Sequence, residues 1–154
     1  MLFLLFHLDN DCYALDASQI AEVLPLVDIK KMLGSPRGVV GTINYHGTFV
    51  PVVDLSEIAL GHRAPSRLST RIILVHRSNE QGPATFLGLV AERATETMWC
   101  ERADFASSGI RNDEAPYLGA VIMRPRGLVQ LVELDKLLPS PLAKLISPQH
   151  AQCP

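Results

Sequence analysis

Short runs of apolar and β-branched residues, separated by turn residues, make up most of the chain. Such runs, bounded by Gly, Pro, Asn or Asp, are typical of strands, whereas a parallel α/β sheet would need crossover helices. The pattern therefore predicts an all-β protein. The expected strands are residues 2–8, 12–15, 20–26, 39–45, 48–53, 71–76, 86–90, 93–100, 117–123 and 128–134.

The clearest local signal is a hairpin whose turn is His46-Gly47. The β-branched runs 39–45 and 48–53 flank these two residues, and Gly47 supplies the positive φ that a tight turn requires. A second hairpin is expected around residues 124–127.

Helical segments are expected to be short. Asp54 is placed to cap a helix over residues 55–60, which Gly61 would end. Single helical turns are expected at residues 16–19 and 135–138.

The two halves of the chain resemble each other. His46-Gly47 precedes Asp54-Leu55 much as Arg126-Gly127 precedes Glu133-Leu134, with one residue fewer in the second case. This similarity predicts two related β units, and the polar stretch 61–70 is the expected boundary between them. Residues 139–154 are expected to form a C-terminal tail after a domain at 1–138.

Composition and charge exclude several classes of protein. Apolar residues make up 47% of the chain, which is enough for a core, and 14 basic against 16 acidic residues give a net charge of −2. This balance disfavours nucleic acid as a partner. The apolar start of the chain is interrupted at Asp9, which favours a buried strand over a signal sequence, and no run is long enough for a membrane helix.

The sequence gives no arrangement of catalytic or metal-binding residues. The three cysteines, Cys12, Cys100 and Cys153, form no CxxC pair, and the five histidines show neither HxH nor HExxH spacing. No phosphate-binding glycine motif is present. We therefore expect no cofactor, no metal and no catalytic residues. Met98 and Trp99 are interpreted as core residues rather than as surface anchors, and Asp54 and Glu133 as helix caps.

One stretch resembles the CheW-like family, which also includes the regulatory domain of the chemotaxis kinase CheA. The resemblance lies in Ile20-Ala21-Glu22-Val23, then Pro36, then the ungapped run Gly41-Thr42-Ile43-Asn44-Tyr45-His46-Gly47-Thr48-Phe49-Val50-Pro51-Val52-Val53-Asp54-Leu55. Looser similarity extends over nearly all of residues 1–138.

This resemblance implies a fold of two five-stranded SH3-like β-barrels with short helical turns. It also implies a non-enzymatic cytoplasmic adaptor that couples the cytoplasmic tip of a methyl-accepting chemoreceptor to the regulatory domain of a CheA-type histidine kinase. Because these 154 residues contain no phosphotransfer, ATPase or receiver segment, a stand-alone coupling protein is expected.

Carried over position by position, the resemblance implies a set of partner-binding residues: Ile20, Glu22, Val23, Asn44, His46, Ile72 and Thr97. His46 departs from the family pattern, which has arginine beside the glycine. Arginine carries a permanent charge and a five-donor fork, whereas histidine is mostly neutral near pH 7. We therefore expect a weakened ion pair with receptor or kinase, and a divergent adaptor in a non-flagellar pathway such as surface sensing or pilus control.

Three other interpretations remain open. The domain could bind only the kinase or another adaptor, it could be a small enzyme that uses Cys100 or a histidine cluster, or it could be a nucleic-acid-binding barrel.

Overall fold

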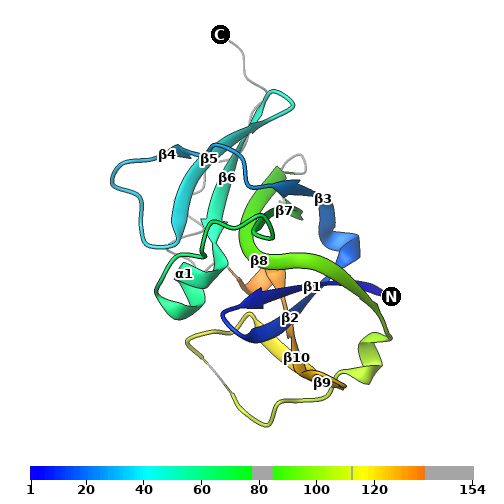
Figure 1. Ribbon diagram of the computed structural model, residues 1–154. Helices are drawn as coiled ribbons and strands as arrows, with labels where there is room; N and C mark the ends of the chain where they lie inside the picture. The colour runs from blue at the N-terminus through cyan, green and yellow to red at the C-terminus, as the bar shows by residue number, and fades with distance from the viewer. Residues whose placement is uncertain (78–84, 112, 138–154) are drawn as a thin grey trace.

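The computed structural model describes residues 1–77, 85–111 and 113–137, and strands make up most of this part of the chain (Figure 1). The strands are β1 (Leu2–Leu8), β2 (Asp11–Asp16), β3 (Ile20–Pro25), β4 (Lys30–Lys31), β5 (Val39–Tyr45), β6 (Thr48–Asp54), β7 (Arg71–Arg77), β8 (Thr85–Trp99), β9 (Leu118–Arg124) and β10 (Gly127–Val132). The helical segments are α1 (Leu55–Leu60) and the 3₁₀ turns η1 (Ala17–Gln19), η2 (Arg102–Asp104) and η3 (Leu134–Lys136). The all-β prediction is confirmed.

The strands form two groups that share β8. In the first group the order is β8, β1, β2, β10, β9, and in the second the main path runs β4, β5, β6, β8, with β7 and β3 continuing from β8. Most pairs are antiparallel, but β10 lies parallel to β2 and β6 lies parallel to β8. Since the paths end at β9, β4 and β3, closure of each group into an SH3-like barrel stays a prediction.

A single long strand, β8, replaces two strands expected from the sequence. The sequence suggested a break between residues 90 and 93, but β8 spans 15 residues. Arg93 has a φ of 50°, and the register against β1 shifts between Leu5 and His7. An irregularity of this kind bends a strand without ending it, so each half of β8 joins a different group.

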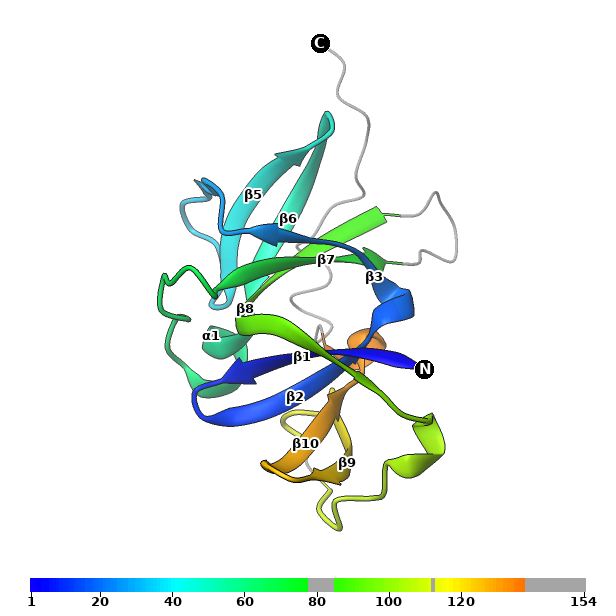
Figure 2. The same ribbon diagram turned by 45° about the vertical axis from the view of Figure 1, so that its right-hand side comes forward.

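The two groups are not successive in the chain, contrary to the expected boundary at residues 61–70. Strands on both sides of this stretch pair within the second group, since β3 pairs with β7 and β6 pairs with β8. The N-terminal hairpin β1–β2 instead joins β9 and β10 near the C-terminal end of the described chain (Figure 2). The expected tail at 139–154, with Cys153, lies outside the described residues.

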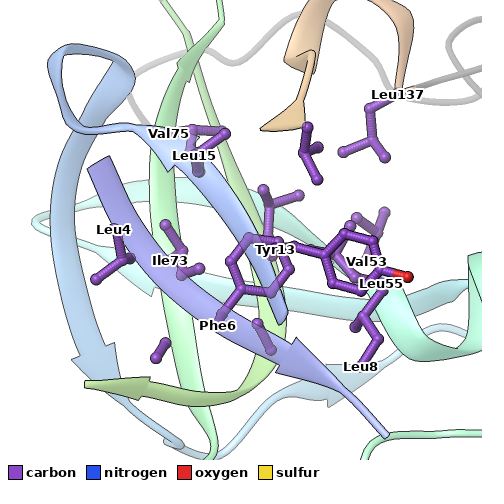
Figure 3. Packing of buried hydrophobic residues seen from close by; sticks show 14 of the residues in the cluster. Leu4, Phe6, Leu8, Tyr13, Leu15, Val53, Leu55, Ile73, Val75 and Leu137 are labelled. Atoms are coloured by element: carbon purple, nitrogen blue, oxygen red, sulfur yellow. The ribbon is translucent and has the colours of Figure 1, made fainter. Parts of the chain in front are cut away.

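The largest hydrophobic core takes side chains from both groups, as Figure 3 shows. Phe6 and Leu15 come from the first group and Ile73 and Leu89 from the second, and all four are fully buried. A side chain of this size stabilises the fold by about 2 kcal/mol when it is fully buried. The shared core therefore holds the two groups together as one unit.

The residues Met98 and Trp99 divide between core and surface. Met98 is 2% exposed and packs with Phe3 in a smaller core inside the first group, as expected. Trp99 is 74% exposed, so its assignment to the core is wrong. Adjacent strand residues point to opposite faces, and only one face of this end of β8 is covered.

The two hairpins β5–β6 and β9–β10 are built alike. The turns are His46-Gly47 in the first and Pro125-Arg126 in the second. Aligned on these turns, Gly47 and Arg126 each stand seven residues before the acidic residue that follows the hairpin, so the one-residue gap in the sequence comparison disappears. Each second strand then joins a parallel neighbour and leads into a helical segment.

The acidic residues after the two hairpins differ in role. Asp54 is 3% exposed and caps α1, because its carboxylate accepts hydrogen bonds from the backbone N–H groups of Glu57 (3.2 Å) and Ala64 (3.0 Å). Gly61 ends the helix at a φ of 88°, as predicted. Glu133 makes no side-chain cap of η3, so its predicted capping role is wrong. It forms an ion pair with Lys136 at 3.0 Å instead.

Candidate functional site

The end of hairpin β5–β6 is held against β3 by one short hydrogen bond. The Tyr45 hydroxyl donates to Glu22 Oε2 at 2.6 Å, although 23 residues separate the two in sequence. This bond is the main reason that the pKa of Tyr45 lies above its usual value. Glu22 is exposed and Tyr45 is half-buried, so the pair forms a surface feature that two strands create together.

Aromatic contacts fix the same end from its other sides. The Tyr45 ring meets the His46 ring edge-on, with centroids 4.4 Å apart, and it meets Phe86 of β8 in the same way at 5.6 Å. His76 of β7 lies 5.5 Å from Phe86. Edge-to-face pairs of this kind add about 0.5–1.5 kcal/mol beyond simple burial. Tyr45 is thus the residue that joins β3, the turn and β8.

The turn itself presents His46 to solvent. His46 and Gly47 have φ values of 50° and 86°, as expected for a two-residue turn of the primed type, and histidine tolerates the left-handed conformation better than most residues. The Asn44 side chain accepts a hydrogen bond from the Gly47 backbone N–H at 2.9 Å. Asn44 therefore stabilises the turn while lying on the surface.

Three of the residues expected to bind partners gather here: Glu22, Asn44 and His46. Together with Tyr45 we call them the β5–β6 surface. Val23, next to Glu22 on β3, is 38% exposed. Ile20, at the start of β3, is half-buried and packs against the main core.

The other four expected residues are not part of this surface, and two of them, Ile72 and Thr97, lie on strands other than β3 and β5. Ile72 is 0% exposed and packs in the core of the second group, so its side chain is unavailable to a partner and the expectation is corrected. A β-branched residue of a strand that is covered on both faces serves packing. Thr97 is exposed, but it pairs with Leu4 in the first group of strands, away from β3 and β5.

Tyr45 was missed as a site residue by the sequence analysis. Its only sequence signal is an aromatic residue immediately before a hairpin turn, which is common in strands for packing reasons alone. Its partners Glu22 and Phe86 are distant in sequence, so only the fold identifies its role.

One cysteine of the described chain, Cys12, lies next to a histidine, but the pair is unsuited to nucleophilic chemistry. The structure places His7 directly opposite Cys12 across β1 and β2, which the sequence did not suggest. Burial raises the pKa of the Cys12 thiol and lowers that of His7. A reactive cysteine requires the opposite shift, towards the thiolate. Among residues 1–77, 85–111 and 113–137, no group of three or more metal-ligating side chains is found.

Within the same described ranges, no helix is long and apolar enough to cross a membrane. The exposed features of the described residues are hairpin ends and strand surfaces, which are the kinds of surface that protein-binding modules use.

The comparisons with known proteins identify the family. Residues 2–142 match the model of the CheW-like domain, and the chain therefore belongs to the CheW-like family. Members of this family are scaffold and adaptor proteins of chemotaxis rather than enzymes, and they interact in general with chemoreceptors and CheA.

One solved structure with the same fold is the scaffolding protein TtCheW from Thermoanaerobacter tengcongensis. The two share 21% sequence identity with a TM-score of 0.75, over 86% of this chain and 84% of that chain. No curated protein matches this chain.

Proposed function

We propose that this protein couples the cytoplasmic tip of a methyl-accepting chemoreceptor to the regulatory domain of a CheA-type histidine kinase, and that the β5–β6 surface makes one of these contacts. The observation that carries the proposal is the bond between Glu22 and Tyr45. It gathers the residues that match the family's motif on one exposed, preorganised surface. Preorganisation favours binding because little side-chain freedom remains to be lost.

A cytoplasmic position at receptor arrays belongs to the same proposal, as does a non-flagellar pathway such as surface sensing or pilus control. The support for a specialised pathway is His46. Where arginine would give a partner carboxylate a permanent, two-pronged ion pair, histidine offers one ring edge-on to Tyr45. The partners of this adaptor are therefore expected to differ in charge from those of arginine-bearing relatives.

The test is a binding measurement with two labelled partners, a receptor tip fragment and a kinase regulatory domain. Glu22→Lys removes the acceptor of the Tyr45 hydroxyl and reverses the surface charge, so we expect affinity for one partner to fall at least about tenfold, or about 1.4 kcal/mol. Asp113→Lys is the matched control, because Asp113 is 80% exposed and lies in the loop between η2 and β9. Failure of the folded wild-type protein to bind either partner would contradict the proposal.

A second candidate function is a domain that binds the kinase or another adaptor but no receptor. The departure at His46 favours this candidate. His46→Arg separates the two: a gain of receptor binding indicates a lost contact, whereas unchanged binding to the kinase alone indicates a different set of partners.

A further inference from the structure

The hairpin β9–β10 carries an exposed surface beside a groove, and the side chains of this surface differ in chemistry from those of the β5–β6 surface. The groove has a volume of about 550 Å³. Its walls come from β1, β2, β8 and the turn of hairpin β9–β10, and its apolar lining includes Leu5, Leu128 and Val129. Such an opening, part apolar and part polar, is the usual form of a binding site at one end of a group of strands.

The apolar part continues onto the outside of the hairpin. Met123 and Leu128 lie directly opposite each other on β9 and β10, and they are 71% and 57% exposed. Exposing two large apolar side chains to water costs free energy, and binding of a partner recovers about 25 cal/mol for each Å² of apolar surface that it covers. We call Met123, Arg124, Arg126 and Leu128 the β9–β10 surface.

The charge at this end is carried by two arginines. The Arg126 side chain is 91% exposed, and its ion pair with Glu96 is long, at 3.9 Å, so it contributes little and leaves the guanidinium available. Arg124 is exposed and forms no ion pair with another described residue. The lining of the groove also includes Asp11 of β2 and Glu96 of β8. A ligand that meets the hairpin side therefore needs carboxylates next to apolar groups.

The position of this surface matters as much as its chemistry. In both views the β9–β10 hairpin lies at the bottom of the molecule and the β5–β6 hairpin at the top (Figures 1 and 2). Partners bound at the two ends therefore need not compete for space.

We propose that the β9–β10 surface is a second docking site, and that it takes a segment of a partner protein in which acidic and apolar side chains alternate or lie side by side. This inference rests on the proposed adaptor function, because a coupling protein needs two surfaces that hold two partners at once. Arginine is suited to the role, since its planar fork binds carboxylates in pairs and its stem covers apolar surface.

The test compares two variants against the two labelled partners named above. Arg124→Glu/Arg126→Glu should lower the affinity for one partner at least tenfold and leave the affinity for the other within twofold of the wild type. Glu22→Lys should give the reverse pattern. Arg111→Glu is the control, because Arg111 is 89% exposed and lies outside both surfaces. The affected affinity should also fall as salt is raised, because salt screens exposed charges.

The remaining outcomes separate a failure of the second docking site from a failure of the adaptor function. If the double variant binds both partners normally, or if Arg111→Glu weakens binding equally, the second docking site is wrong while the adaptor function stands. Binding of neither partner by the wild type overturns both. Binding to anionic vesicles and to an oligonucleotide is measured as well, because lipids and nucleic acids also carry acidic groups. If the double variant loses binding to these probes but not to either protein partner, the inference is overturned. Arg124→Gln/Arg126→Gln repeats the test without charge reversal, and equal thermal melting confirms that each variant folds.

Discussion

The hairpins β5–β6 and β9–β10 have the same construction and opposite surface chemistry. The first ends in Tyr45 and His46, which are aromatic and tied to β3 and β8 by a hydrogen bond and ring contacts. The second ends in arginines and exposed aliphatic side chains, and the contact found for its turn is the long pair between Arg126 and Glu96. One backbone design can thus support two different binding surfaces, since the turn residues are not constrained by the core.

The difference extends into the strands behind each turn. When the hairpins are aligned on their turns, Gly41 corresponds to Ala120. Gly41 lies against the short strand β4, which pairs with β5 at two positions, whereas the matching edge of β9 meets a single bridge, between Val121 and Ala106. The following predictions test whether the two hairpins are equivalent in construction and different in their contacts.

The largest expected effect is at Gly41. A Cβ atom at this position would collide with the backbone carbonyl of Lys30, so Gly41→Ala must displace β4. We expect a loss of more than about 2 kcal/mol in the free energy of unfolding, measured by urea denaturation. The matched change Ala120→Gly should cost no more than about 1 kcal/mol, from backbone entropy alone. Equal losses at the two positions would show that β4 does not distinguish the hairpins.

An intermediate effect is expected at the acidic residues that follow the hairpins. Asp54→Ala leaves two backbone N–H groups without their acceptor near a buried helix start, and we expect a loss of about 2–3 kcal/mol. Glu133→Ala removes only partly exposed ion pairs and should cost less than about 1 kcal/mol. Thermal melting of both variants checks the order, and a larger loss at Glu133 would contradict it.

The smallest effect concerns the ionisation of Tyr45. Its hydrogen bond to Glu22 raises the pKa of the phenol, because the carboxylate accepts the proton that ionisation removes. In Glu22→Gln the pKa of Tyr45 should move down towards the ordinary value of about 10. Absorbance titration of tyrosinate, with Tyr45→Phe used to subtract the signals of Tyr13 and Tyr117, measures the change. An unchanged titration would mean that the bond does not persist in solution.

Local sequence signals were sufficient for much of the fold. The hairpin at His46-Gly47, the cap at Asp54 and the stop at Gly61 are confirmed, because each depends on residues within one turn of backbone. Asn44 and His46 belong to the same short motif, so the sequence alone predicts that they lie close together on one surface.

The burial of individual strand residues could not be predicted from the sequence, because it depends on neighbours that are distant in the chain. Trp99 has a large apolar side chain of the type usually found in a core. It is exposed because other strands cover the opposite face of this end of β8. The family resemblance places Ile72 near a partner-binding surface, but β3 and β8 flank its strand and its side chain is fully buried.

The sequence by itself determined the all-β class, the hairpins and the family, because alternation, turn chemistry and a local motif are properties of neighbouring residues. The tertiary structure decided that β8 serves both groups, that the N-terminal hairpin joins β9 and β10, and that Glu22 meets Tyr45. These features arise from pairing across long stretches of chain. The free energy of such pairing comes from the shared core as a whole, and no single segment encodes it.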